Sequence, residues 1–367
     1  MKILFTGGGT GGHIMPIIAI GRELKKLDPQ NNLELHYIGP KEGTDILITE
    51  KFKIHNIVSG KIRRYFSLLN IVDIFFSIPL GFLQSFFLLL FIRPKLVFSK
   101  GGSGSLVVCF AAKVLRIPIF LHESDSIPGM SNQKISKWAK KIFISFPNTE
   151  YFEKSKTTLV GNPIRKDLLQ INKEEANRIL NLTRERPVIL FWGGSQGAEA
   201  INELVLSNLN IFLSQYEIIH ISGEKNYRNV KAESRALLNK EEKIYYHLYK
   251  SMNELELKSA LIICNFVVSR AGSGSIFEIS AFGIPVIIIP LPSSAQNHQS
   301  KNAYEYAKTG AGIVIEQENL TPNLFMSKIN NIISDSKTFK KMQESALNFS
   351  KPEAGETIAK EIIAYLK

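Results

Sequence analysis

The first candidate for chemistry is a histidine that follows a glycine-rich turn. The segment 7–17 reads GGGTGGHIMPI, and His13 comes directly after its last glycine. An apolar run precedes the turn and helical spacing follows it, so the backbone amides of a helix N-terminus should converge there and bind an anion. An imidazole with a pKa near ~6.5 suits proton transfer beside such a site. His13 is therefore a candidate general base or substrate contact. The alternatives are a structural histidine and a glycine turn that serves only tight packing.

A second candidate pair follows the apolar run at 117–121, where the sequence reads LHESDSIPG. His122 and Glu123 stand between this run and a turn, so they should lie at the carboxyl end of a strand, the edge at which parallel sheets bind ligands. Glu123 is a candidate catalytic residue beside His13. The alternative is an ion pair between Glu123 and one of the many lysines.

Three further glycine-rich loops each follow an apolar run: GGSGS at 101–105, GGSQG at 193–197 and AGSGS at 271–275. With two loops in each half of the chain, both halves can present amides to one cleft, which suits a donor diphosphate on one wall and an acceptor on the other. Glu278 follows Ser275 by three residues and should lie on the next helix, where its carboxylate can accept hydrogen bonds from two ribose hydroxyls. The alternative is a capping-box glutamate paired with Ser275.

The elements that must position these residues follow from the hydrophobic pattern. Apolar runs of strand length at 2–5, 96–99, 188–192 and 266–269 each enter a glycine loop. Such continuous runs suit strands that are buried on both faces of a parallel sheet. Strands that alternate with helices in both halves predict an α/β protein with two doubly wound Rossmann-like domains facing a central cleft.

The length of 367 residues exceeds the ~250–300 residues at which one hydrophobic core usually stops growing, so two domains are expected. The turn-like GNP at 161–163 marks the boundary. Residues 1–162 then form an N-terminal domain that faces acceptor and membrane, and 163–349 form a C-terminal donor-binding domain. Helical spacing in 350–367 predicts a final helix that returns to the first domain.

Composition narrows the function. Cys109 and Cys264 lie in apolar runs without zinc or disulfide spacing, and the first residues resemble a strand rather than a signal peptide, so a reducing cytoplasm is expected. The net charge of +12 fits nucleic acid, anionic lipid or phosphorylated small molecules. No recognisable nucleic-acid module accompanies the charge, so nucleic acid is not an expected partner. The first glycine loop lacks both the dinucleotide fingerprint and the Walker signature.

The most apolar segment of the chain covers 71–92, and its length reaches the ~20 residues that span a bilayer. Asp73 and Pro79 argue against a simple span. Basic residues flank the segment on both sides: Lys61, Arg63, Arg64, Arg93 and Lys95. This pattern is typical of an interfacial element that also meets anionic headgroups. Three interpretations stay open: a buried helix of the first domain, a surface-docking element and a transmembrane helix.

Seven motifs together resemble the MurG family of peptidoglycan transferases, the undecaprenyldiphospho-muramoylpentapeptide β-N-acetylglucosaminyltransferases. They are, in order, GGGTGGHIMPI, GGSGS, HESDSIPG, GNPIR, GGSQGA, SRAGSGSIFE and NHQSKNA, and they extend over essentially the whole chain. The resemblance implies the GT-B fold, no catalytic metal, and inverting transfer of N-acetylglucosamine from UDP-GlcNAc to the lipid-linked muramoyl-peptide, which converts lipid I to lipid II. It also implies a peripheral protein on the cytoplasmic face of the inner membrane.

The resemblance assigns positions as well. The donor contacts of the family fall on Thr10, Gly11, Gly12, Asp125, Arg165, Ser195, Tyr249, Ser273, Gly274, Ser275, Ile276, Phe277, Glu278 and Gln299. In this set Glu278 would contact the ribose, Gln299 the sugar hydroxyls, and the backbone near Tyr249 the uracil. Asp125 departs from the asparagine that many members carry, and a carboxylate accepts hydrogen bonds from sugar hydroxyls but cannot donate them as an amide does.

The implied reaction has two needs. The acceptor hydroxyl must lose a proton as it attacks, and we assign this to His13, with Glu123 as the residue that orients it or takes its place. The leaving diphosphate gathers negative charge, which the loop around Ser195 and the cation of Arg165 would stabilise. The alternatives are a GT-B glycolipid transferase with another acceptor and a non-enzymatic nucleotide-binding protein. An NAD-dependent oxidoreductase is disfavoured because the fingerprint is absent.

Overall fold

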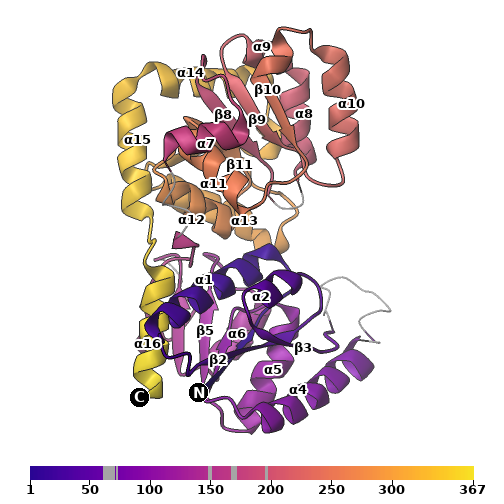
Figure 1. Cartoon of the computed structure of the whole chain (residues 1–367), viewed down its shortest axis with the longest axis vertical. Helices are drawn as coiled ribbons and strands as arrows, with labels where there is room; N and C mark the ends of the chain where they lie inside the picture. Colours follow the sequence, from indigo (N-terminus) through magenta and orange to yellow (C-terminus); the bar gives the residue numbers. More distant parts are fainter. Residues whose placement is uncertain (61–70, 72, 148–150, 167–171, 195–196) are drawn as a thin grey trace. The chain divides into compact units, whose positions relative to one another are not determined.

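A computed structural model describes residues 1–60, 71, 73–147, 151–166, 172–194 and 197–367. By their contacts these residues form two compact units (Figure 1). The first unit comprises Met1–Arg165 together with Lys351–Lys367, and the second comprises Lys166–Ser350. Each unit is an α/β fold, which confirms the predicted fold class.

The first unit is built on a parallel sheet whose described strands follow the order β3-β2-β1-β4-β5-β6-β7. The strands are β1 (Lys2–Thr6), β2 (Glu34–Gly39), β3 (Lys53–Asn56), β4 (Leu96–Ser99), β5 (Ile119–Glu123), β6 (Lys141–Ile144) and β7 (Thr157–Leu159). The strand order reverses between β1 and β4. The carboxyl ends of these two strands therefore flank a topological switch point, where doubly wound sheets bind ligands.

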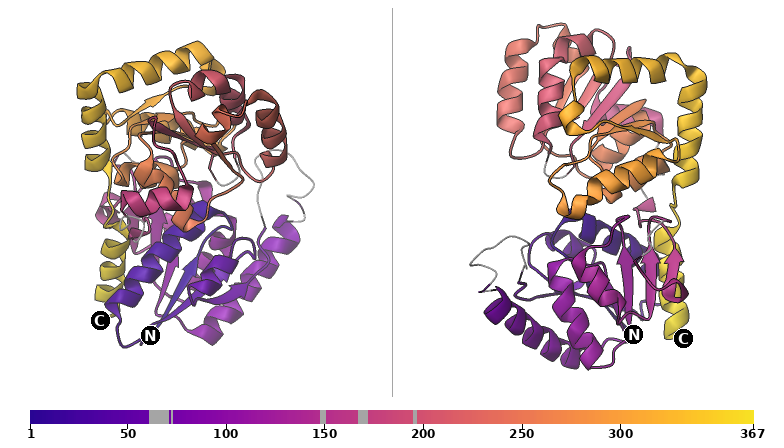
Figure 2. Two further views of the ribbon diagram at one scale, coloured as in Figure 1. Left: turned by 45° about the horizontal axis from the view of Figure 1, so that its top comes forward. Right: turned by 180° about the vertical axis from the view of Figure 1, so that it is seen from behind.

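Helices cover both faces of this sheet. They are α1 (Gly11–Leu27), α2 (Asp45–Thr49), the π-helix η1 (Asp73–Ser77), α4 (Ile78–Ile92), α5 (Ser103–Val114), α6 (Met130–Ser136), the short η2 (Lys154–Lys156) and α16 (Ala354–Leu366). Ile3 and Phe5 of β1 pack with α1 and α16 on one face, whereas Leu4 packs with α4, α5 and α6 on the other. Helices α1 and α16 lie side by side (Figures 1 and 2).

The second unit repeats this plan with the described strand order β10-β9-β8-β11-β12-β13, again parallel. The strands are β8 (Val188–Trp192), β9 (Glu217–Ile221), β10 (Tyr246–Tyr249), β11 (Phe266–Ser269), β12 (Val286–Ile288) and β13 (Gly312–Val314). The order reverses between β8 and β11, so the carboxyl ends of these strands flank the second switch point.

The helical segments of the second unit are α7 (Lys173–Leu180), α8 (Glu199–Ser207), α9 (Leu209–Leu213), α10 (Tyr227–Leu237), η4 (Glu242–Tyr245), α11 (Glu254–Ile263), α12 (Ser273–Ala281), η5 (Ala295–Asn297), α13 (His298–Ala307), η6 (Gln317–Asn319), α14 (Pro322–Ser334) and α15 (Ser336–Phe349). Leu190 and Val267 pack against α7, α11, α12 and α13 on one face of the sheet. Ile189 and Phe191 pack against α8, α9 and α14 on the other.

Residues 73–92 of the apolar segment form η1 and α4. Their buried side is narrow and consists of Gly81, Ser85, Leu89 and Ile92. Phe75, Phe76, Phe87 and Phe91 are exposed, with Phe91 at 84%, whereas Phe82 and Phe86 are partly buried against the core. The interpretation as a buried core helix is therefore wrong. Within the described residues, the 20-residue helix Asp73–Ile92 is the one that is long and apolar enough to cross a membrane by length and composition.

Candidate active site

His13 is held between two glycine loops at the switch point of the first unit. It is the third residue of α1, and its Nδ1 shares a hydrogen bond of 2.8 Å with Thr10 Oγ1. A Cβ atom added to Gly8 would come within 3.0 Å of His13 Nδ1, and one added to Gly102 within 3.3 Å of Nε2. A side chain at either position would press on the ring, and Gly102 also has a φ of 94° and lies against the backbone of Gly8. Nε2 has no hydrogen-bond partner among the described residues and is the nitrogen that can meet a substrate.

The N-terminus of α1 is open to an anion. Thr10 occupies the N-cap, but its hydroxyl bonds to the histidine ring instead of capping a described backbone amide. Side chains added to Gly11 or Gly12 would meet no described atom within 4 Å. The first turn contains no acidic residue. The positive end of the helix dipole thus faces free space beside His13.

The pKa of His13 is lowered to about 4, chiefly because burial disfavours the charged ring and next because Lys100 adds a positive charge nearby. Asp125 opposes this shift. The ring is therefore neutral and able to accept a proton at neutral pH. A helix N-terminus by itself also disfavours the charged imidazolium ring, so its effect on the pKa has the same direction as those of burial and Lys100.

Glu123 is the last residue of β5, as the sequence predicts, and is 3% exposed. Its Oε1 accepts a hydrogen bond of 2.9 Å from the backbone N–H of Asp125, and its Oε2 accepts one of 2.7 Å from Asn132 Nδ2. Burial raises the pKa of Glu123, and the negative charge of Asp125 raises it further. The carboxyl group is thus fixed in orientation and has a higher proton affinity than an exposed glutamate.

His122 points away from solvent and is fully buried. Its Nε2 bonds to the carbonyl oxygen of Gly161 at 3.0 Å. Burial, and then the charge of Lys100, lower the pKa of His122 well below its usual value. His122 therefore joins β5 to the GNP turn as a neutral structural group.

Lys100 belongs to this site, although sequence reasoning did not select it. It follows β4 directly, is 1% exposed, and donates a hydrogen bond of 2.5 Å from Nζ to Ser124 Oγ. Burial lowers the pKa of Lys100, whereas Glu123 and Asp125 raise it. The sequence signal that could have identified Lys100 is its place between the apolar run at 96–99 and the glycine pair at 101–102.

The predicted residues of the second unit gather on α12. Ser273 is its first residue and Gly272 its N-cap, and side chains added to Gly272 or Gly274 would meet no described atom within 4 Å. Glu278 is buried on the second turn. The cap carries no side-chain hydrogen bond within the described part of the chain, so the capping-box interpretation of Glu278 is wrong.

Other predicted donor contacts are more constrained. Ile276 and Phe277 are 1% exposed, so a ligand can meet them only through the backbone. Gln299 on α13 accepts a hydrogen bond of 3.0 Å from the backbone N–H of Leu291 through its Oε1. The carbonyl oxygen of Tyr249 accepts a bond of 3.0 Å from the N–H of Ser222.

Some predicted positions fall elsewhere. Arg165 is buried and is the last residue of the first unit before the division. The GGSQG loop follows β8, and its Gly194 and Gly197 have positive φ angles of 84° and 77°. Ser195 of this loop lies outside the described residues, and so do the basic flanks Lys61, Arg63 and Arg64.

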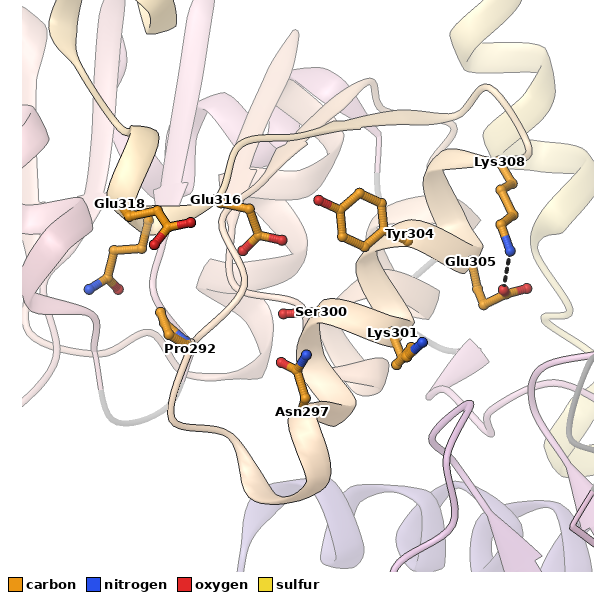
Figure 3. Close-up of a pocket in the computed structure, with 10 residues that line it drawn as sticks. Pro292, Asn297, Ser300, Lys301, Tyr304, Glu305, Lys308, Glu316 and Glu318 are labelled. Carbon is orange, nitrogen blue, oxygen red and sulfur yellow. Dashed lines mark hydrogen bonds and ion pairs between the residues drawn. The ribbon is translucent and has the colours of Figure 1, made fainter.

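A hollow of about 520 Å³ lies beside α13 in the second unit (Figure 3). Ser300, Lys301 and Tyr304 line it from the helix, and Glu316 and Glu318 from the segment after β13. None of the predicted donor contacts lines this hollow. It is therefore distinct from the residues that α12 presents.

Comparison with known proteins decides the family. Residues 3–144 match the glycosyltransferase family 28 N-terminal domain. Residues 188–358 match the C-terminal domain of the same family. The UDP-N-acetylglucosamine–N-acetylmuramyl-(pentapeptide) pyrophosphoryl-undecaprenol N-acetylglucosamine transferase of Shouchella clausii is 38% identical over 342 residues, 92% of each chain. The enzyme of the same name from Clostridium tetani is 35% identical over 350 residues, 94% of each chain. The chain belongs to this transferase family, the MurG family.

Solved structures agree with MurG membership at the level of the fold. Acinetobacter baumannii MurG has a TM-score of 0.74 at 22% identity and 99% coverage of both chains. The UDP-bound MnaA of S. aureus has a TM-score of 0.75 at 14% identity, with 100% of this chain and 97% of that chain covered. MurG membership thus confirms the predicted family and its GT-B architecture.

Proposed function

We propose that the protein transfers N-acetylglucosamine from UDP-GlcNAc to the lipid-linked muramoyl-peptide, converting lipid I to lipid II in peptidoglycan synthesis. The match over both domains to relatives whose names state this donor and this acceptor carries the proposal. Membership in a transferase family disfavours the oxidoreductase and the non-enzymatic alternative. A GT-B transferase with another acceptor remains the alternative that an assay must test.

His13 is the proposed general base for the acceptor hydroxyl. Its Nδ1 is held by Thr10, so Nε2 faces the substrate and receives the proton as the oxygen attacks the anomeric carbon. Attack on the face opposite the leaving UDP inverts that carbon. The open N-terminus of α1 supports this assignment, because the amides at Gly11 and Gly12 can hold a diphosphate beside the ring. Glu123 is the proposed orienting residue.

The donor contacts are proposed on α12 and its neighbours. A Cβ atom added to Gly272 or Gly274 would meet no described atom within 4 Å, so the start of α12 has room for the diphosphate of UDP, whose negative charge grows as it leaves. The Glu278 carboxylate accepts from the ribose hydroxyls, and the Gln299 amide group donates to the sugar. Ser195, Arg165 and the remaining family positions complete the proposed set.

A peripheral position on the cytoplasmic face of the inner membrane is proposed through α4. Phe75, Phe76, Phe87 and Phe91 are all more than half exposed along η1 and α4, and a hollow of about 630 Å³ beside the helix is lined by apolar residues together with Lys2 and Arg93. Apolar rings beside basic groups favour insertion at an anionic lipid surface. Docking there would bring the site to an acceptor that is itself held in the bilayer.

The decisive experiment incubates the purified protein with labelled UDP-GlcNAc and the lipid-linked muramoyl-peptide. Label should enter the lipid phase with the wild type, and much more slowly with His13→Ala. Binding of UDP without transfer would support the non-enzymatic alternative. Transfer to another glycolipid, but not to the muramoyl lipid, would support the alternative acceptor.

A further inference from the structure

Lys100 is a charged side chain with almost no access to solvent. Its exposure is 1%, and it stands between β4 and the glycines Gly101 and Gly102 at the switch point of the first unit. Burial of an ammonium group is costly unless it is paired with opposite charge and hydrogen-bonded. The retention of a lysine here therefore requires partners that compensate the buried charge.

The contacts of Lys100 join the first glycine loop to the turn after β5. Its backbone N–H donates a hydrogen bond of 2.8 Å to the carbonyl oxygen of Thr6. A Cβ atom added to Gly7 would lie 3.5 Å from the Cβ of Lys100. At the far end of the side chain, Nζ donates a hydrogen bond of 2.5 Å to Ser124 Oγ. In the sequence, Ser124 is the residue between Glu123 and Asp125.

The charged and titratable groups that face Lys100 come from two directions. His13 approaches from α1, and His122, Glu123 and Asp125 come from the end of β5 and the turn after it. Thr6 from β1 adds a neutral backbone carbonyl group. The titratable groups around this position are therefore one ammonium group, two carboxyl groups and two imidazole rings.

We propose that Lys100 is a positioning residue of this active site: its bond to Ser124 holds the turn that carries Glu123 and Asp125, and its buried charge sets the pH range of the reaction. The inference rests on the proposed transferase function. Lys100 does not touch substrate, because it is buried and its ammonium group is bonded to Ser124. It acts through the proton affinities of its neighbours.

The charge of Lys100 acts in the same direction on the pKa values of both candidate bases, His13 and Glu123. The charge of Lys100 lowers the pKa of His13 and also lowers that of Glu123. Loss of the charge should raise both values, so the base would be protonated at higher pH and the acid limb of the pH–kcat profile should move upward. Asp125 raises the pKa of both groups, so Asp125→Asn should move the same limb downward.

The test compares Lys100→Met, Asp125→Asn and the wild type over about pH 3 to 9, with kcat measured at saturating substrates. The range extends to low pH because the pKa of His13 is about 4. Lys240→Met removes an exposed lysine of the second unit and is the matched control. We expect the acid limb of Lys100→Met to rise by about one pH unit or more. Asp125→Asn should shift the limb in the opposite direction, and the control should coincide with the wild type. An acid limb that does not move in Lys100→Met overturns the proposal, even if kcat falls.

A second readout is independent of catalysis. The imidazole of His13 can be titrated by NMR in the wild type and in Lys100→Met, with UDP affinity and circular dichroism as checks of folding. The midpoint of His13 should rise in the variant. If Lys100→Met does not fold, the same titration in Asp125→Asn should show a fall, and an unchanged midpoint there overturns the proposal. Failure of sugar transfer in the wild type would refute the proposed function but leave this titration decisive for Lys100.

Discussion

Thr10 Oγ1 and His13 Nδ1 lie 2.8 Å apart, so the residue that caps α1 fixes the ring of the histidine instead of a backbone amide. The consequence is twofold. The ring presents Nε2, and the Thr10 side chain leaves the N-terminus of the helix uncapped, where an anion can bind. Thr10→Val keeps the shape of the side chain but removes the hydroxyl, so the ring should lose its fixed orientation. We expect kcat to fall about tenfold, the equivalent of one hydrogen bond, and Thr10→Ser to restore most of it.

Replacement of the proposed base His13 should lower kcat far more than replacement of Thr10. Loss of a general base typically costs ~10²–10⁴ in rate, so His13→Ala should lose that much kcat. UDP affinity by calorimetry and the circular dichroism spectrum should stay near those of the wild type. If Glu123→Gln loses far more kcat than His13→Ala, with both proteins folded and binding UDP, then the roles of the two residues are reversed.

The pH dependence of kcat in the wild type can show, without any mutation, whether His13 or Glu123 is the general base. Because the pKa of His13 is about 4, a reaction that uses this base should keep a level kcat from about pH 8 down to about pH 5.5. Burial and Asp125 raise the pKa of Glu123, so a reaction that uses the glutamate should already lose rate well within this range. Measurement of kcat under saturating substrates, rather than kcat/KM, reports the groups of the bound complex.

Glu278 offers a test of donor binding. Glu278→Ala should weaken UDP binding by about 1–3 kcal/mol, because two ribose hydroxyls lose a charged acceptor. The matched control is Glu233→Ala, which removes an exposed glutamate of α10 and should leave UDP affinity unchanged. Unchanged UDP affinity in Glu278→Ala would exclude Glu278 from the donor site.

Membrane docking through α4 makes a separate prediction. Replacing Phe87 and Phe91 with serine should reduce binding to anionic vesicles, by up to about 1.5–3 kcal/mol for each ring that is fully buried in lipid. Arg93→Gln should cost roughly 1 kcal/mol more and lower the salt dependence. Leu347→Ser, at an exposed position of the second unit, is the control. If neither salt nor alkali releases the wild type from membranes, α4 spans the bilayer instead.

The sequence predicted the strands of both sheets well where local pattern and tertiary burial agree. The runs at 96–99, 188–192 and 266–269 became β4, β8 and β11 with the same bounds. Strands at the centre of a parallel sheet are buried on both faces and so appear as continuous apolar runs. Glycine turns at their carboxyl ends then locate both switch points.

Other features depend on contacts that a linear sequence does not show. Lys100 meets Ser124 only because β4 and β5 are neighbours in the sheet, so its role could not follow from local pattern. The segment at 71–92 is apolar enough for either a core or a surface helix, and only the structure shows how few of its residues are covered. The capping alternative for Glu278 failed because Gly272, and not Ser275, is the N-cap of α12.

The packing of α16 on α1 gives the first unit an unusual order of assembly. Gly355 of α16 lies against Ala19 of α1, and Ile358 and Ile362 complete the core that also holds Ile3 and Phe5. A ribosome makes 166–350 before it makes these residues, so the second unit can close while the first still lacks one wall. The helix that carries His13 therefore becomes fully supported only late in synthesis, and a nascent chain should display UDP binding earlier than sugar transfer.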